Sequence, residues 1–534
     1  MNINTYTNPI LYTDYSDPDA IRVKDDYFMI ASSFSNVPGI PILHSKDLIH
    51  WQIINYVLDN LPEKRYEKPI HGCGVWAPSI RYHEGIFYVC FPMPDEGIYM
   101  CTTTDPFGKW SAPVNIRPQA GWIDPCPFWD DDGKAYLVAG VAKSRIGYKS
   151  VLHIVEMQPD GLGLIGPEIK IFDGNENGQE TIEGPKLYKR NGYYYIFAPA
   201  GGVKTGWQTV LRSKNIWGPY DYKVVMRQGN TPVNGPHQGA WVDTPNGDDF
   251  FIHFQDVYSA GRITHLQPMK WVNDWPVIGA PVEGQDYGQP VLEWEMPLIQ
   301  TKEQPYSYPL TDDDFSSDRL GLQWQWNANP QESFYKLEDK TLYLFAQNKM
   351  TVYADAANLL LQKWPAKEFA CITQVDISNL TLGDETGIVS LGMEYGVVSI
   401  KRTAENFEIS RVFGKQTLGK ILVEHTDEES LVLDKFSLDK NIIYFKYIVE
   451  SDGYQDLSAD ERSFPKERVS ISYSFDGIKY SEALSMTAVP GRWVGVKNGV
   501  FCLSDNPSSK GFAKVLSVKY IGCLCNLECH TQSH

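Results

Sequence analysis

The amino-acid sequence predicts an all-β fold, with an N-terminal five-bladed β-propeller followed by a C-terminal β-sandwich. Three observations carry this prediction. Helical periodicity is nearly absent, a hairpin-like segment recurs five times in the first half of the chain, and a different set of alternating strands fills the second half. The length of 534 residues agrees, because a chain of this size normally forms two or more domains.

Each copy of the repeat is a short turn followed by an aromatic and β-branched run. The copies lie at 24–31, 83–90, 131–138, 190–197 and 245–253. Aligning the turns makes five aromatic residues equivalent: Phe28, Tyr88, Tyr136, Tyr195 and Phe250. Asn-Gly and Asp-Gly turns close hairpins, and a repeat of about 50 residues is typical of propeller blades. Five unrelated hairpins are the alternative, but they would not explain the companion segments at 44–51, 102–110 and 212–220.

The repeat stops near residue 280, which sets the predicted domain boundaries. We expect the propeller over 1–290, a linker containing Pro, Gln and Glu over 291–311, the sandwich over 312–522 and a loose tail over 523–534. The sandwich is predicted to be of the lectin-like jelly-roll kind. Its alternating runs are 340–347, 369–377, 386–393, 441–449, 468–475, 492–503 and 514–522.

Composition narrows the classes of partner. The formal net charge of −18 disfavours binding to nucleic acid and to anionic membrane surfaces, and no stretch is apolar enough to span a bilayer. A small, neutral oligosaccharide is compatible with this charge, and so is a homo-oligomer. The sequence from Met1 has no signal-peptide pattern, and nine Cys residues, an odd number, do not form a disulfide framework. We therefore expect a cytoplasmic location.

The repeat also places three carboxylates together. In a propeller, equivalent positions on the innermost strands of successive blades converge on the central axis. The positions 11 to 13 residues before the aligned aromatics hold Asp17, Trp76, Asp124, Glu183 and His237. A single Asp or Glu in a loop is more often a turn or capping residue, but convergence from separate copies favours one shared axial site.

Such a set suits glycoside hydrolysis. That reaction uses one carboxylic acid to protonate the leaving oxygen and one carboxylate to activate water or to attack the sugar. The negative charge of a third acid nearby disfavours ionisation of the proton donor, so that it stays protonated near neutrality. A non-catalytic carbohydrate-binding propeller is the remote alternative. It would keep the aromatic residues, but it would not need three acids at equivalent positions.

At these residues the sequence resembles glycoside hydrolase family 43. The motifs are NPILYTDYSDPDAIRV (8–23), GWIDPCPFWDDDGKAYLV (121–138) and TIEGPKLYKRNGYYY (181–195). The resemblance implies that Asp17 is the general base, Asp124 the residue that modulates the pKa of the acid, and Glu183 the general acid of an inverting reaction. The usual Pro-Asp-Pro is Ser16-Asp17-Pro18 here, so Asp14 and Asp19 compete for the role of base. Asp14 is the weaker competitor, because it falls off the repeat register.

Further matches lie at 38–51, 74–82 and 235–254, and the resemblance to two-domain β-xylosidases and α-L-arabinofuranosidases extends over essentially the whole chain. It implies that Phe34, Trp76 and Arg262 bind the sugar. The alternatives are a core Phe34 and an Arg262 in an exposed salt bridge. His237 is implied to lie near the axis, where water or Ca²⁺ can sit, but a hydrogen-bonded structural histidine is the interpretation we favour.

The cluster of Cys523, Cys525, Cys529 and His530 lacks paired zinc-knuckle spacing, and we expect thiols without a metal role there. The sequence thus predicts an exo-acting, inverting glycosidase that releases terminal pentose, and β-1,4-xylosidase activity on xylo-oligosaccharides comes first. The alternative is an α-L-arabinofuranosidase, or an enzyme with both activities, that acts on arabinoxylan or arabinan oligosaccharides. No cofactor is expected to be required, with Ca²⁺ at the propeller axis as the one candidate.

Overall fold

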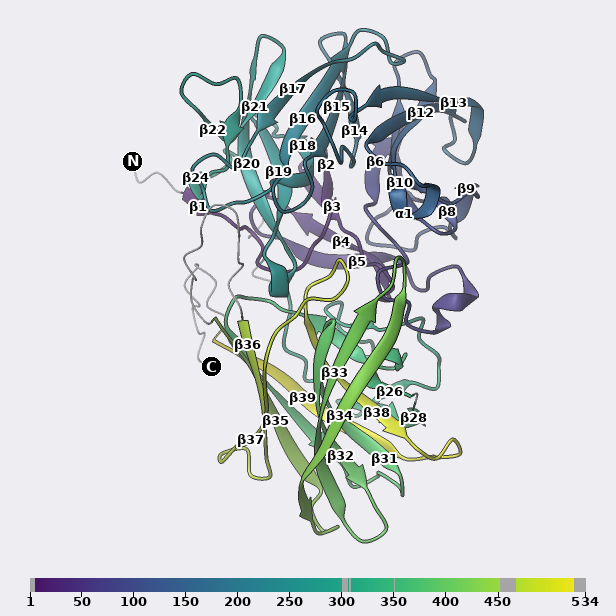
Figure 1. The fold of residues 1–534 in the computed structure, drawn as a ribbon, viewed down its shortest axis with the longest axis vertical. Coiled ribbons are helices and arrows are strands. Elements are labelled where there is room, and N and C mark those ends of the chain that lie inside the picture. The colour runs from purple at the N-terminus through teal and green to yellow at the C-terminus, as the bar shows by residue number, and fades with distance from the viewer. Residues whose placement is uncertain (1–4, 300–305, 307–308, 350, 452–466, 523–534) are drawn as a thin grey trace.

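The computed structural model describes residues 5–299, 306, 309–349, 351–451 and 467–522. Figure 1 shows two β-rich domains in contact, the propeller in purple to teal and the sandwich in green to yellow. Helical turns are short: α1 (Lys143–Ile146), η1 (Lys64–Glu67), η2 (Tyr258–Ala260) and η3 (Tyr353–Asp355). Within the described residues, no helix has the length and apolar character that crossing a bilayer would need.

The propeller consists of five antiparallel sheets, each built from four strands that follow one another along the chain. The first strands are β2 (Asp19–Val23), β6 (Ser79–His83), β10 (Trp122–Trp129), β14 (Lys186–Arg190) and β18 (His237–Asp243). The second strands are β3 (Asp26–Ile30), β7 (Ile86–Met93), β11 (Ala135–Val141), β15 (Tyr193–Ala200) and β19 (Asp249–Asp256).

The third strands are β4 (Gly39–Ser45), β8 (Gly97–Thr103), β12 (Val151–Met157), β16 (Trp207–Ser213) and β20 (Arg262–Val272). The outermost strands are β5 (Gln52–Leu58), β9 (Val114–Arg117), β13 (Leu164–Asp173), β17 (Asp221–Met226) and β21 (Trp275–Ile278). Two short strands, β22 (Ala280–Pro281) and β23 (Gly288–Gln289), extend the fourth sheet. The predicted five-bladed propeller is therefore confirmed, and each of the five aligned aromatics lies in the second strand of its blade.

The ring closes between the fifth and the first blade. The first strands of the first four blades lie beside one another in order, and β18 lies beside β2 and also contacts β15. The segment before β2 runs along the fifth blade, where the side-chain amide of Asn8 donates to the carbonyls of Leu266 and Val291. In addition, β1 (Thr5–Thr7) pairs with β24 (Glu293–Glu295), so part of the expected linker is a strand that holds the N-terminal segment.

Over the described residues, the second domain is a sandwich of two sheets, which are antiparallel apart from one short parallel pair. One contains β25 (Gln325–Trp326), β28 (Gln347–Asn348), β29 (Leu360–Lys363), β31 (Asp384–Leu391), β32 (Glu394–Arg402), β33 (Phe407–Leu418), β34 (Val423–Phe436) and β38 (Lys497–Ser504). The other contains β26 (Tyr335–Glu338), β27 (Thr341–Phe345), β30 (Phe369–Asp376), β35 (Ile442–Ser451), β36 (Glu467–Ser474), β37 (Ser481–Thr487) and β39 (Phe512–Ile521).

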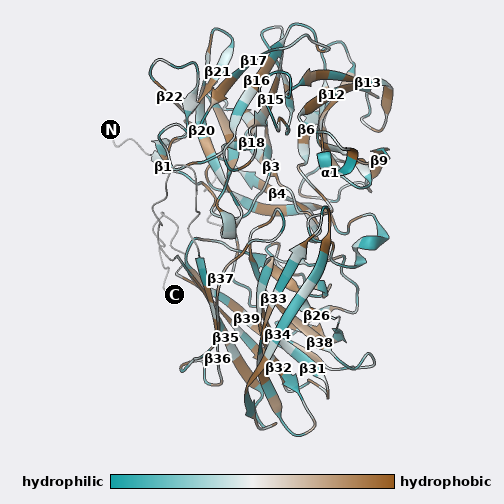
Figure 2. Ribbon diagram, viewed as in Figure 1, coloured by the Kyte–Doolittle hydropathy of each residue, from teal (hydrophilic) through white to brown (hydrophobic). Residues whose placement is uncertain are grey.

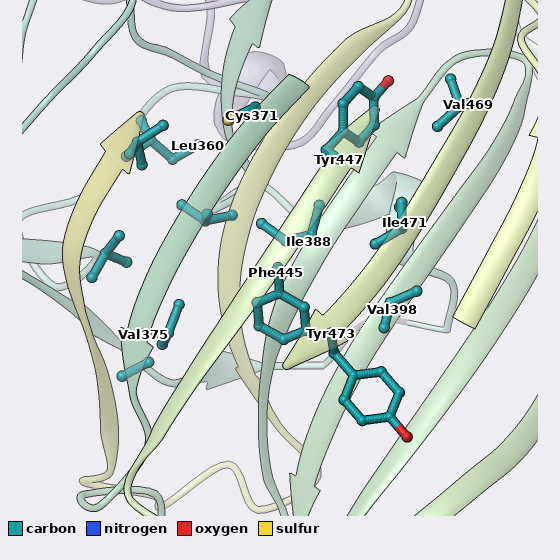
Figure 3. Packing of buried hydrophobic residues seen from close by; sticks show 14 of the residues in the cluster. Leu360, Cys371, Val375, Ile388, Val398, Phe445, Tyr447, Val469, Ile471 and Tyr473 are labelled. Atoms are coloured by element: carbon teal, nitrogen blue, oxygen red, sulfur yellow. The ribbon is translucent and has the colours of Figure 1, made fainter. Parts of the chain in front are cut away.

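Alternation along these strands builds the core of the sandwich. Figure 2 shows hydrophobic and hydrophilic residues alternating along them, as expected when one face of each sheet is buried. Val398, Phe445 and Ile471, from three different strands, pack together between the sheets and are fully buried (Figure 3). Several strands of the sandwich were not predicted, among them β32, β33, β34 and β37. In β33 and β34 the reason is that many of their residues are polar and exposed.

One predicted strand is shorter than expected, and the difference matters for the site. The alternating run at 492–503 forms strand only from Lys497 onward. The residues before it form a loop that crosses to the propeller, where the Gly495 amide donates to Asp14 Oδ2 and the Val496 amide donates to the carbonyl of Ser259. The sandwich therefore reaches the mouth of the propeller through this loop.

Candidate active site

The five converging positions all lie where the chain enters an innermost strand. Asp17, Trp76 and Glu183 come just before their strands, and His237 is the first residue of β18. Asp124 is the third residue of β10, at a register irregularity between Ile123 and Cys126. All five therefore lie at the same end of the propeller axis, and the contacts described next join them into one site.

Asp17 is held by groups that point their donors at its carboxylate. The hydroxyls of Ser16 and Ser32 donate to Oδ2 at 2.8 and 2.6 Å. Arg262 Nη1 donates to Oδ1 at 3.1 Å and also to the hydroxyl of Ser16 at 2.7 Å. Since a guanidinium can only donate, this surrounding suits a carboxylate that accepts hydrogen bonds. Arg262 is thus a buried partner of Asp17, and the alternative of an exposed salt bridge is wrong.

The two competing aspartates have other contacts. Both carboxylate oxygens of Asp14 accept backbone amides, from Arg262 and Gly495, at 2.9 Å each. Asp19 is fully buried, and its Oδ2 accepts the Ile80 amide and Arg81 Nη1. Asp14 thus joins the two domains, and Asp19 joins the first two blades. Of the three, Asp17 is the one whose carboxylate lies in the electrostatic reach of Asp124.

Glu183 is the most open of the three converging acids. About a quarter of its side chain is exposed (24%), whereas the side chain of His237 is completely buried. His237 Nε2 lies 2.8 Å from Glu183 Oε1. This contact joins the fourth blade to the fifth. His237 contacts Oε1 of Glu183, so Oε2 is the carboxyl oxygen that can face a substrate.

Asp124 is buried behind Glu183. Its Oδ2 accepts the backbone amide of Gly184 at 2.8 Å. Burial, followed by the negative charges of Glu183 and Asp17, raises the pKa of Asp124 to about 8. The positive charge of Lys186 opposes this shift. The sequence suggested an ionised Asp124 that keeps Glu183 protonated, whereas burial places the raised pKa on Asp124 itself. The coupled acids therefore hold a proton near neutral pH, and it belongs to the group as a whole.

Aromatic rings surround these acids. The Phe34 and Trp76 rings lie with centroids 6.4 Å apart, and the Phe34 amide bonds the carbonyl of Val75, which sets the first blade against the second. Arg145 covers the Trp76 ring at 5.0 Å. Phe34 is buried, as expected of a core residue. Its ring also lies next to Trp76, as expected of a residue that borders the sugar.

The sequence did not single out Trp493, which the sandwich contributes to the site. Its ring lies 6.3 Å from that of Trp76 and 5.8 Å from the guanidinium carbon of Arg262, and 43% of the residue is exposed. Trp493 stood in a segment predicted as strand, and no repeat exists in the sandwich to align it with the propeller. Only the Pro490-Gly491 pair, a turn signal, could have indicated the loop.

Backbone conformation marks the same residues. Asp17, Phe34, Asp124 and Trp493 all have positive φ, between 52° and 67°. An L-residue in this region costs about 1–3 kcal/mol, most for bulky side chains, and such residues cluster at functional sites. Two acids and one aromatic residue of the propeller therefore share this backbone conformation with one aromatic residue of the sandwich. The surrounding structure holds all four in it.

The imidazole of His237 contacts Glu183, and calcium binding near it stays a prediction. No group of three or more His, Cys, Asp or Glu side chains in the described part of the chain is arranged to hold a metal ion. Calcium takes about six to eight oxygen ligands, which an imidazole and one carboxylate do not supply. Cys523, Cys525, Cys529 and His530 lie outside the described residues. The six cysteines that the structure does describe are all buried.

Comparison with known proteins decides the family. Residues 6–276, more than half of the chain, match the family model for glycosyl hydrolases family 43. The chain belongs to glycosyl hydrolase family 43. Residues 312–521 match the concanavalin A-like domain found at the C-terminus of β-xylosidases. This family 43 chain is therefore a glycoside hydrolase, and its sandwich is of the predicted lectin-like kind.

Similar proteins span nearly the same length. A protein of Xylanibacter ruminicola with a provisional β-xylosidase name is 37% identical over 98% of this chain and 91% of its own length. A β-xylosidase of Formosa agariphila is 29% identical over 94% of this chain and 88% of its own. A non-reducing-end α-L-arabinofuranosidase of Bacteroides ovatus is 32% identical over 63% of this chain and 64% of its own.

Solved structures agree with the fold of both domains. A family 43 protein from Bacillus licheniformis superposes with a TM-score of 0.79 at 25% identity, covering 97% of this chain and all of the other. A bifunctional GH43-CE protein of Bacteroides eggerthii gives the same TM-score at 26% identity. The match covers 97% of this chain, which spans 64% of that longer protein.

Proposed function

We propose that this family 43 chain is an inverting exo-β-xylosidase that removes single xylose units from the non-reducing ends of xylo-oligosaccharides. One observation carries the proposal. Carboxylates from three blades meet at one end of the propeller axis, and a tryptophan from the second domain stands beside them. The relatives that match nearly the whole chain are named as β-xylosidases, which supports xylose as the sugar.

Asp17 is the general base in this proposal. Its carboxylate accepts hydrogen bonds from Ser16, Ser32 and Arg262, which hold it in one orientation. A carboxylate held in this way can take a proton from a water molecule as the water attacks the anomeric carbon. Because the water attacks on the face opposite the leaving group, the product sugar has the inverted configuration.

Glu183 is the general acid. It is the most exposed of the three acids, and His237 Nε2 lies against Oε1. A neutral His237 that carries its proton on Nε2 donates to Oε1 and directs Oε2 toward the glycosidic oxygen. Protonation of that oxygen by Glu183 lets the rest of the oligosaccharide depart as an alcohol.

Asp124 is the residue that couples the acids. Its contact with the Gly184 amide fixes the backbone beside Glu183. Its position close to Asp17 and Glu183 makes the loss of a proton from the group costly, since like charges repel. The group therefore keeps, near neutral pH, the proton that the leaving group needs.

The walls of the site support exo-action. Trp76, Trp493 and Phe34 offer rings that can pack against a sugar, and Arg262 offers further guanidinium donors. Because the loop that carries Trp493 belongs to the sandwich, a second domain lies across one side of the propeller mouth. A long polymer chain would collide with it, whereas a chain end fits.

The test compares two chromogenic substrates and one natural one. The protein should hydrolyse p-nitrophenyl β-D-xylopyranoside and xylobiose, and proton NMR should show α-xylose as the first product. Faster hydrolysis of p-nitrophenyl α-L-arabinofuranoside would instead support the activity named for the Bacteroides ovatus relative. A first product that keeps the β-configuration would contradict inversion.

A further inference from the structure

The propeller axis has a second opening, at the opposite end from the three acids. The five innermost strands end at this opening, at or near Arg22, His83, Trp129, Arg190 and Asp243. At about 3.3 Å per strand residue, the part of β2 from Asp19 to Arg22 spans about 10 Å. A pocket of about 660 Å³ occupies this opening, a volume typical of small-molecule sites. We name it the distal funnel, lined among others by Tyr82, His83, Trp129, Tyr188, Trp241 and Asp249.

Aromatic rings form part of the wall. The rings of His83 and Trp129 stack 5.1 Å apart at an angle of 13°. Tyr82 precedes His83 on the same strand, its ring lies 4.8 Å from that of Phe87, and 42% of the residue is exposed. Trp241 contributes a half-buried indole whose Nε1 donates to Asp249 Oδ1 at 2.6 Å. Flat rings at the edge of a pocket offer apolar faces of the kind on which sugar rings stack.

Most charged side chains of the funnel have an ion-pair partner, and Asp249 instead accepts a hydrogen bond from the Trp241 indole. Arg22 Nε donates to Asp243 Oδ1 at 3.1 Å, and Lys189 Nζ lies 2.9 Å from Asp131. Arg190 faces Asp274 at 3.6 Å.

Arg81, at the base of the funnel, donates to Asp19 at 2.7 Å. A charged ligand would have to compete with these pairs, and breaking the buried Arg81–Asp19 pair would leave a buried charge without a partner. A neutral ligand with many hydroxyls can instead hydrogen-bond to paired groups without separating them.

A polar layer separates the funnel from the acids. The Arg81 guanidinium bridges Asp19 and the Cys126 sulfur and lies over the Tyr188 ring at 5.3 Å. Asp19 and Cys126 are fully buried. A ligand in the distal funnel therefore does not reach Asp17 or Glu183, which makes the funnel a place for binding and not for hydrolysis.

We infer that the distal funnel is a second carbohydrate site, which binds a neutral oligosaccharide without cleaving it. The choice of a xylo-oligosaccharide as ligand rests on the proposed function, whereas the preference for a neutral sugar rests on the funnel alone. Some oligosaccharide molecules would then stay bound at the distal funnel while the active site, at the other end of the axis, releases single sugars.

Fluorine NMR of protein labelled with 5-fluorotryptophan tests the inference. The Glu183→Gln variant prevents turnover, and Trp129→Phe in that background assigns the funnel signal. Titration with xylotetraose should shift the Trp129 signal as well as the Trp76 and Trp493 signals. Movement of the Trp76 and Trp493 signals alone would overturn the second site. Failure of the wild-type protein to hydrolyse xylobiose is measured separately and bears only on the proposed function.

A variant gives an independent check. Tyr82→Ala removes an exposed ring at the funnel and should weaken the binding reported by Trp129 about tenfold. It should leave kcat/KM on p-nitrophenyl β-D-xylopyranoside unchanged. Trp217→Ala, which removes a similarly exposed ring on the outer part of the fourth blade, should change neither quantity. Equal effects of both substitutions on Trp129 would contradict the site.

Discussion

The axis of the propeller and the core of the sandwich bury different kinds of side chain. At the propeller axis, Asp17, Asp124 and His237 are almost completely removed from solvent. The sandwich core contains residues such as Phe445 and Ile471, and its strands bring apolar side chains together by simple alternation (Figure 3). Buried charges require partners and add little to stability, whereas buried hydrocarbon stabilises directly. Substitutions at the axis should therefore change chemistry, and substitutions in the sandwich core should change stability.

The largest effect on catalysis is expected from Asp17→Asn. Without a base to activate water, kcat should fall by about 10⁴-fold at every pH, since positioned acid–base groups contribute up to this much. The measurement is the pH profile of kcat on xylobiose. Asp25→Asn, at an exposed position near the first hairpin turn, is the control and should behave as wild type. A profile that only shifts along the pH axis would exclude Asp17 as base.

The second prediction separates the acid from the base. Glu183→Gln should lower kcat on xylobiose by about 10³-fold, but it should lower kcat far less on p-nitrophenyl β-D-xylopyranoside, because a good leaving group needs little protonation. The thermal unfolding curve should remain close to wild type. Glu180→Gln, exposed and three residues away, is the matched control. Equal, mild losses on both substrates would remove Glu183 from this role.

Asp124→Asn should move the pH profile and should also alter stability. Removing the most buried acid weakens the hold of the group on its proton, so the basic limb of kcat should move to lower pH. The native group of coupled acids keeps a proton up to about pH 8, whereas the unfolded Asp124 carboxyl, with a pKa near 3.8, releases it earlier. The wild-type free energy of unfolding should therefore fall as pH rises between these values, and the variant should lack this dependence.

Denaturant titrations between pH 4 and pH 8 measure the stability part, and initial rates over the same range measure the limb. A basic limb that stays in place or moves to higher pH would show that Asp124 does not couple the acids. A stability difference between wild type and variant that is independent of pH would contradict the raised pKa.

The loop from the sandwich should have a smaller effect on catalysis. Trp493→Ala removes a ring beside Trp76 and Arg262, and kcat/KM on xylobiose should fall by about three- to tenfold, mostly through KM. Ile478→Ala, at an exposed position elsewhere in the sandwich, should leave both constants unchanged. If Trp493→Ala had no effect on KM, the sandwich would border the site without contacting the sugar.

The smallest effect on catalysis is expected from the sandwich core. Ile471→Ala creates a cavity among fully buried side chains and should lower the free energy of unfolding by about 2–5 kcal/mol. At a temperature where the variant is folded, kcat should match the wild type. Urea unfolding and initial rates test the two halves of this prediction. A large loss of kcat in the folded variant would show that the two domains are coupled more tightly than their cores suggest.

The repeat made the axis predictable, because equivalent positions in consecutive blades must converge. Aligning Tyr88, Tyr136 and Tyr195 was enough to bring Asp124 and Glu183 to one end of the propeller, where the structure places them. Family resemblance then indicated Asp17 despite the serine that precedes it. Pattern and periodicity thus predicted both domains and their architecture.

The partners of these acids were beyond such reasoning. Arg262 lies on the third strand of the fifth blade, far from Asp17 in sequence, and resemblance indicated a sugar contact but not the bond to the base. Burial of Asp124, which places the raised pKa there, follows from packing that one sequence does not display. Trp493 comes from a loop whose residues alternate like those of a strand, so its path to the propeller depends on tertiary contacts alone.

The position of Asp14 has a consequence for how such an enzyme can be cut or recombined. Its carboxylate holds the amide of Arg262, the partner of the base, and the amide of Gly495, two residues beyond Trp493. The Asp14 side chain thereby links the position of Arg262, and with it Asp17, to the loop of the second domain. A propeller produced without its sandwich would lose this tie, so the two domains cannot be exchanged as independent modules and must be inherited as one catalytic unit.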